Sequence, residues 1–274
     1  MAADETRTIF DTEVIHDPAG SNRPLAGEGM LIINADDWGR DATTTERILE
    51  CAQRRALSSA SAMVFMQDSE RAAVLALEHG VDVGLHLNLT TSFSTSSIPA
   101  TLVDHHQRVS RFLTRNRLAQ VVYHPGLTRS FEYVVAAQLE EFCRIYGFAP
   151  RRVDGHHHMH LCANVLFAGL LPAGTIARRN FSFLPGDKSG LNRLYRRTID
   201  RKLARKHRLT DFLFSLPPLE PQERLDRLFG IARHSVVEME THPVSPDEHR
   251  FLAGGEIFRR IGELNIAPSF EISI

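Results

Sequence analysis

Residues 30–39 read MLIINADDWG, an apolar run that ends in two acidic side chains and a glycine. Short apolar runs of this kind alternate downstream with stretches of helical periodicity. The runs at 59–65 (SASAMVF) and 81–90 (VDVGLHLNLT) are expected strands, and helices are expected over 44–57 and 69–79. Because strands that alternate with helices pair in parallel, the pattern predicts an α/β fold with a parallel sheet.

The rest of the chain continues this alternation of predicted strands and helices, with one interruption. A helix is expected over 131–146, and the further strand candidates are RRVDGHHHMH (151–160), TIARR (175–179), SVVEMETHP (235–243) and PSFEISI (268–274). Residues 1–29 show no sustained period and are expected to be an irregular N-terminal extension to a single domain over 30–274. Residues 91–130 break the alternation and are expected to form a long loop or lid with short helices. A basic amphipathic helix over 192–208 presents either a solvated face or a site for an anion or partner.

The composition excludes several functional classes. The 274 residues are 43% hydrophobic and 24% charged, and Lys+Arg 32 nearly cancels Asp+Glu 33, so neither nucleic acid nor an anionic membrane is expected as a partner. The acidic start lacks the features of a signal peptide, and no apolar run approaches the ~20 residues of a membrane span, which favours a cytoplasmic protein. Cys51, Cys143 and Cys162 have no CxxC spacing and are expected to be small buried side chains. The 14 histidines are the unusual feature.

Two adjacent carboxylates, Asp36 and Asp37, follow the first apolar run. Both cannot be desolvated cheaply, so either a cation neutralises them or one is protonated. A metal ligand beside a general base meets both conditions, provided that the chain curls near Gly39, since neighbours in a regular strand face opposite ways. Phosphate-accepting and structural turn aspartates have the same appearance.

Two histidine-bearing strands point to a metal. In VDVGLHLNLT one face is apolar and the other carries His86, which would point into a barrel mouth; a merely hydrogen-bonded histidine is the alternative. In VDGHHHMH, strand alternation would place Asp154, His156, His158 and His160 on one side and His157 on the other. Spacing does not choose among the three histidines. One carboxylate and two imidazoles leave open coordination positions, as in metal-assisted hydrolases.

A further strand end, VVEMETHP, carries Glu238, Glu240 and His242. A second proton carrier on the far side of a tetrahedral intermediate would serve as general acid, and His242 could fill that role. A structural, hydrogen-bonded histidine is the alternative for this position.

The motifs NADDWG, GLHLNLT, VDGHHHMH and EMETHP, in this order, resemble those of the YdjC-type carbohydrate deacetylases, and the resemblance extends from Leu31 to the C-terminus. It implies an irregular TIM-like β/α barrel and the removal of acetyl groups from N-acetylated sugars. By the matching positions, Asp36 would be the general base on the metal-bound water and His242 the general acid. The metal ligands would be Asp37, His86 and His156.

The resemblance also implies one divalent ion. Magnesium is the metal usually taken for the family, whereas two imidazoles and a carboxylate suit zinc better, so both stay open. Trp38 could stack on a sugar ring, and His158 and Arg178 are further candidates for substrate contact. The chain departs from the usual pattern at Arg40 and Val244, which leaves the identity of the sugar open. A homodimer is possible.

Two rival functions remain. A metal-dependent phosphoesterase would need basic side chains near the metal ligands, and by sequence only Arg40 and Arg152 qualify. A non-catalytic sugar-binding protein on the same barrel would need no separate base and acid. The presence of Asp36, Asp37 and His242 together therefore argues against the second rival.

Overall fold

The computed structural model describes residues 29–183 and 190–270. Within these ranges the strands are β1 (Met30–Trp38), β2 (Ser59–Ala62), β3 (Val83–Leu87), β4 (Arg152–Gly155), β5 (Ile176–Ala177), β6 (Phe212–Ser215) and β7 (Val236–Thr241). The α-helices are α1 (Ala42–Gln53), α2 (Ser69–His79), α3 (Ala100–Thr114), α4 (Thr128–Tyr146), α5 (Ala163–Ala168), α6 (Gly190–Leu203), α7 (Gln222–Ala232), α8 (Pro246–Ala253) and α9 (Glu256–Ile261). Three 3₁₀ helices are η1 (Arg117–Gln120), η2 (Pro125–Leu127) and η3 (His156–Leu161).

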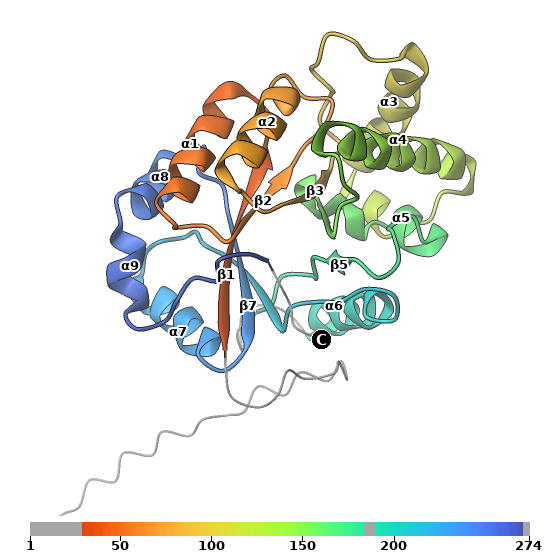
Figure 1. Ribbon diagram of the computed structural model, residues 1–274. Helices are drawn as coiled ribbons and strands as arrows, with labels where there is room; N and C mark the ends of the chain where they lie inside the picture. The colour runs from red at the N-terminus through yellow and green to blue at the C-terminus, as the bar shows by residue number, and fades with distance from the viewer. Residues whose placement is uncertain (1–28, 184–189, 271–274) are drawn as a thin grey trace, which may run out of the picture.

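All the paired strands run parallel in one seven-stranded sheet, in the order β5-β4-β3-β2-β1-β7-β6. The sheet curls so that its two edges approach each other: Ile176 of β5 forms a bridge with Arg208, and the Ser182 amide donates to the Leu213 carbonyl of β6. Helices surround the curled sheet (Figure 1). The predicted α/β fold with an irregular β/α barrel is therefore confirmed.

Alternate residues of each strand face two different environments. Leu31, Ile33 and Ala35 of β1 belong to the main apolar core that the helices cover. A second apolar cluster, Ile32, Ile176, Val236, Ala267 and Phe270, lies near the starts of the strands. Polar side chains, by contrast, gather inside the barrel toward the strand ends, and they are buried there. The buried polar groups therefore lie at the carboxyl edge of the sheet, where β/α barrels have their active sites.

The structure corrects three local predictions. Residues 156–160 do not continue β4 as a strand but belong to η3. His157 and His158 adopt left-handed backbone angles (φ 54° and 57°), which end the extended chain and kink this 3₁₀ segment. The strand expected at 268–274 is not formed over 268–270, and residues 271–274 lie outside the described ranges. Cys143 is exposed rather than buried, whereas Cys51 and Cys162 are buried as expected.

Segments without a clear sequence pattern also form regular secondary structure. Residues 91–130 contain α3, which packs along α4, together with η1 and η2; a lid function for this segment stays a prediction. Strand β6 and helices α7, α8 and α9 had not been anticipated. The basic helix begins at Gly190 and ends at Leu203, with Ile199, Asp200 and Leu203 buried. Across the described residues, every helix is too short or too polar to cross a bilayer.

Candidate metal centre and active site

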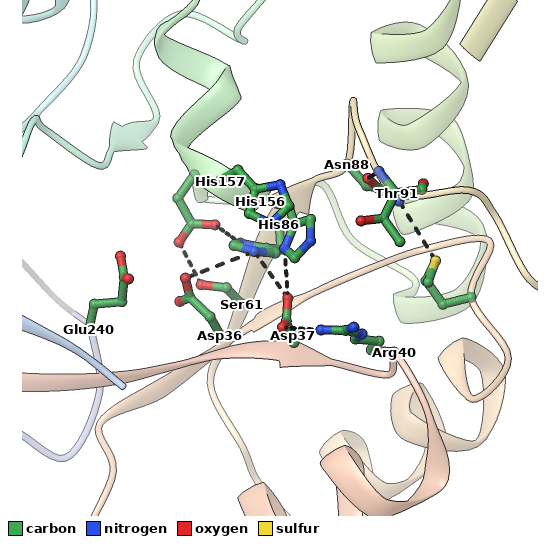
Figure 2. Close-up of polar contacts among 12 residues, drawn as sticks. Asp36, Asp37, Arg40, Ser61, His86, Asn88, Thr91, His156, His157 and Glu240 are labelled. Carbon is green, nitrogen blue, oxygen red and sulfur yellow. Dashed lines mark hydrogen bonds and ion pairs between the residues drawn. The ribbon is translucent and has the colours of Figure 1, made fainter. Parts of the chain in front are cut away.

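The end of β1 brings two adjacent carboxylates to the same site. Asp37 itself adopts a left-handed backbone conformation (φ 71°), and the pairing of β1 with β2 slips between Ala35 and Trp38. This is the curl that the adjacent aspartates required, and it starts at Asp37, two residues before Gly39 (φ 84°). Asp36 and Asp37 are both buried, and their carboxylates lie on the same side of the strand (Figure 2).

Two imidazoles approach Asp37 from other elements. His86 of β3 places its Nε2 3.4 Å from Asp37 Oδ1, and His156, at the start of η3, places its Nδ1 3.0 Å from the same oxygen. Figure 2 shows both rings above Asp37. The left-handed turn at His157 and His158 directs the chain away directly after His156. Residues far apart in the sequence therefore converge on one oxygen atom.

The three side chains fit a divalent cation. One ligand atom from each of Asp37, His86 and His156 lies within 4.8 Å of the others. Among the described residues, Asp37 Oδ1 and His86 Nε2 are buried without a hydrogen-bond partner, an arrangement that costs free energy unless a ligand uses both atoms. Burial acts to raise the pKa of Asp37, but His156 and His86 hold it well below its usual range. The carboxylate is thus ionised, as a metal ligand must be.

Partners behind the ligands fix their orientation. Arg40 donates to the second carboxylate oxygen of Asp37 at 3.0 Å, which leaves Oδ1 facing the imidazoles. His86 Nδ1 lies 2.7 Å from Asp154 Oδ1, the carboxylate–histidine pairing that commonly orients a metal ligand. Burial acts to lower the pKa of His86, but Asp36 and Asp154 raise it to about 10. A cation would therefore have to displace a proton from His86 before binding.

Asp36 is held by a buried arginine. Arg178 donates to Asp36 Oδ2 at 2.6 Å and to Oδ1 at 2.7 Å, and Asn34 adds a hydrogen bond to Oδ1 at 2.8 Å. Arg178 also contacts Glu238, Glu240 and Asp154 at 2.7–3.2 Å. Its side chain is only 1% exposed, so the prediction that Arg178 contacts substrate is wrong: its charge is used to compensate buried carboxylates.

The remaining histidines of η3 have different environments. His157 Nδ1 lies 3.0 Å from Thr90 Oγ1, and its ring packs on His156 at 4.0 Å. His158 Nε2 lies 3.1 Å from Glu240 Oε2, and its side chain is 25% exposed, so it remains a candidate for substrate contact. His160 is fully buried against the Arg178 carbonyl, and burial lowers its pKa to about 3. Of the three histidines that spacing left open, His156 is the one whose ring groups with Asp37 and His86.

His242 lies on the other side of Asp36. Its ring and the carboxylates of Asp36 and Glu240 offer ligand atoms within 4.8 Å of one another. Burial acts to raise the pKa of Glu240, but Arg178 and His158 lower it to about 2, so Glu240 is ionised near neutral pH. A base candidate and an acid candidate thus lie side by side at the metal centre.

Trp38 does not lie where a sugar ring could stack. It is completely buried and belongs to the main apolar core with Ala60 and Leu85. The same backbone turn that directs Asp37 toward the histidines directs Trp38 into the core. The prediction of a stacking surface at Trp38 is wrong.

Comparison with known proteins places these motifs in a family. A model of the YdjC-like protein family matches residues 30–269. The chain belongs to this family. Two curated relatives, both named chitooligosaccharide deacetylase, match about half of the chain. The Serratia marcescens protein is 31% identical over 139 residues (49% of this chain, 51% of that protein), and the Yersinia pestis (strain Pestoides F) protein is 27% identical over 139 residues (50% and 53%).

This YdjC-like chain spans about half the length of the curated relatives it matches. Among solved structures, a "putative cellobiose-phosphate cleavage protein" from Enterococcus faecalis V583 shares the fold, with a TM-score of 0.64 and 19% identity. That similarity covers 88% of this chain and 97% of the other chain. The shared barrel extends over almost the whole described chain.

The sequence analysis assigned no role to two buried carboxylates of this YdjC-like chain, Asp154 and Glu248. Asp154 was placed on the histidine-bearing face without a role, although a carboxylate two residues before His156 could have suggested a partner for a metal-ligating imidazole. Glu248, which accepts hydrogen bonds from Thr241 and from the His242 backbone, gave no sequence signal because it lies in a helix beyond the motif.

Proposed function

We propose that this protein is a metal-dependent hydrolase that removes acetyl groups from N-acetylated sugars or oligosaccharides. The observation that carries the proposal is that ligand atoms of Asp37, His86 and His156 lie within 4.8 Å of one another, while the adjacent Asp36 groups in the same way with Glu240 and His242. The family membership and the chitooligosaccharide deacetylases among the relatives support this substrate class. We infer that Asp37, His86 and His156 are the metal ligands.

A divalent cation at this site supplies Lewis acidity, which polarises the acetamide carbonyl and makes a water molecule more acidic. Two imidazoles and one carboxylate suit zinc better than magnesium by ligand type. Both metals therefore belong in the test.

Asp36 acts as the general base in this proposal. Arg178 binds both of its oxygens and Asn34 adds a hydrogen bond to Oδ1, so Oδ2 accepts fewer hydrogen bonds and keeps a lone pair for the proton of the attacking water. His242 acts as the general acid. As the bond between carbonyl carbon and nitrogen breaks, His242 donates a proton to the leaving amine, and acetate and the free amino sugar are the products.

The structure argues against the phosphoesterase alternative. Arg40 pairs with Asp37, and Arg152 is buried against Asp154 and Ser61. Arg178 is likewise buried among carboxylates. Arg40 and Arg152, the two basic residues that the sequence analysis offered for phosphate recognition, are thus already paired with carboxylates.

Acetate release tests the proposal. The protein is stripped of metal with a chelator, reloaded with zinc or magnesium, and assayed on N-acetylglucosamine, chitobiose and longer chitooligosaccharides. We expect acetate release that the chelator abolishes and one of the metals restores. p-Nitrophenyl phosphate serves as the parallel substrate, and hydrolysis of that ester without acetate release from any sugar would overturn the proposal in favour of a phosphoesterase.

A further inference from the structure

Glu248 connects helix α8 to the segment that carries His242. Its Oε2 accepts the hydroxyl proton of Thr241 at 2.8 Å and the backbone N–H of His242 at 2.8 Å. Thr241 is the last residue of β7, and Glu248 is only 5% exposed. One buried oxygen atom therefore fixes two consecutive residues at the point where the strand ends.

This contact differs from an ordinary helix cap. A glutamate at the third helical position commonly reaches back to the residue that precedes the helix. Here α8 starts at Pro246 after Ser245, and Glu248 reaches three residues further back, to His242. The Ser245 amide meanwhile donates to the His242 carbonyl at 2.8 Å, so both backbone groups of His242 are bonded. The arrangement fixes the loop rather than the start of the helix.

We propose that Glu248 is a positioning residue, whose Oε2 holds the His242 backbone so that the imidazole stays beside Asp36 and Glu240. The inference rests on the proposed function of His242 as general acid. A displacement of about 1 Å at a catalytic group can cost on the order of 100-fold in rate. The ligands proposed above, Asp37, His86 and His156, all lie outside the loop after β7, so we expect the position of this loop to affect proton transfer rather than metal binding.

Three substitutions at Glu248 distinguish the position of its hydrogen-bond acceptor from its negative charge. Both hydrogen bonds end on the same oxygen, so the single amide oxygen of Glu248→Gln can accept both. Glu248→Ala removes the acceptor, and Glu248→Asp withdraws it by one methylene. We expect near wild-type kcat for Glu248→Gln and a loss of about 100-fold in kcat with unchanged KM for Glu248→Ala and Glu248→Asp. Asp247→Ala is the matched control, because its exposed side chain pairs with Arg250 on the same helix.

A second measurement is independent of activity. Amide hydrogen exchange at His242 should be slow in the wild type and in Glu248→Gln, and fast in Glu248→Ala, with zinc affinity equal in all of them. Wild-type kcat and a protected His242 amide in Glu248→Ala would overturn the inference, as would an equal loss of kcat in Glu248→Gln and Glu248→Ala. If even the wild type releases no acetate, the proposed function fails, and amide exchange still decides whether Glu248 holds His242.

Discussion

Individual buried histidines in this protein differ in what surrounds them, and His106 of α3 is an example outside the site. It is 3% exposed, its ring lies 4.2 Å from that of Phe93, and its Nε2 has no hydrogen-bond partner. Burial lowers its pKa from 6.5 to about 4. The imidazole of His106 is therefore neutral in the folded protein at neutral pH.

This residue makes stability depend on pH. The unfolded chain binds a proton at His106 below pH 6.5, whereas the folded chain does so only near pH 4. The contribution of His106 to the free energy of unfolding is therefore complete above pH 6.5 and is lost as the pH falls toward 4. Within that window the folding equilibrium should fall by up to about tenfold per pH unit for this group. We expect His106→Gln to reduce the slope of the free energy of unfolding against pH between pH 4 and 6.5, as measured by urea unfolding. His105→Gln, its less buried neighbour, is the control, and equal slopes in wild type and His106→Gln would contradict the argument.

At the scale of elements, the joint between β4 and η3 positions His156. Gly155 pairs with Leu87 of β3, and a Cβ at Gly155 would lie 2.9 Å from the His160 backbone nitrogen. The return of η3 over the end of β4 therefore leaves no room for a side chain there.

We expect Gly155→Ala to push η3 outward. Overpacking of this kind costs about 1–3 kcal/mol in the free energy of unfolding, and the displaced His156 should weaken zinc binding. Chemical denaturation and zinc titration measure both effects. Gly230→Ala is the matched control: a Cβ at that helical position has open space, and alanine should stabilise the helix by roughly 0.5–1 kcal/mol. Zinc affinity equal to wild type in Gly155→Ala would show that η3 does not depend on this contact.

The same joint shows where sequence reasoning succeeds and where it stops. The strand at 30–38 and the helix ending at Gly80 follow from periodicity and a C-terminal glycine, which are local properties. The left-handed angles of His157 and His158 cannot be predicted from local sequence. Few residues other than glycine, asparagine and aspartate favour such angles, and only tertiary packing imposes them here. The sequence analysis predicts no strand at Phe212–Ser215, where the structure has β6.

At the scale of the whole molecule, the barrel interior gathers four buried carboxylates around one buried arginine. Asp36, Asp154, Glu238 and Glu240 all contact Arg178, and each of them comes from a strand. Four separate motifs in the sequence could predict which residues reach the strand ends, because parallel strands share one carboxyl edge. They could not predict that Arg178 would lie beneath that edge rather than in the mouth, because the partner of a buried arginine is set by long-range packing.

The central claim is that this barrel divides two adjacent carboxylates between two roles, with Asp37 binding the metal and Asp36 moving the proton. The most direct test measures zinc affinity by calorimetry and acetate release from chitobiose on the same preparations of wild type, Asp36→Asn and Asp37→Asn. We predict that Asp36→Asn keeps zinc affinity but loses at least about 100-fold in kcat, the usual contribution of a general base, while Asp37→Asn loses zinc binding. Wild-type kcat in zinc-loaded Asp36→Asn would contradict the account.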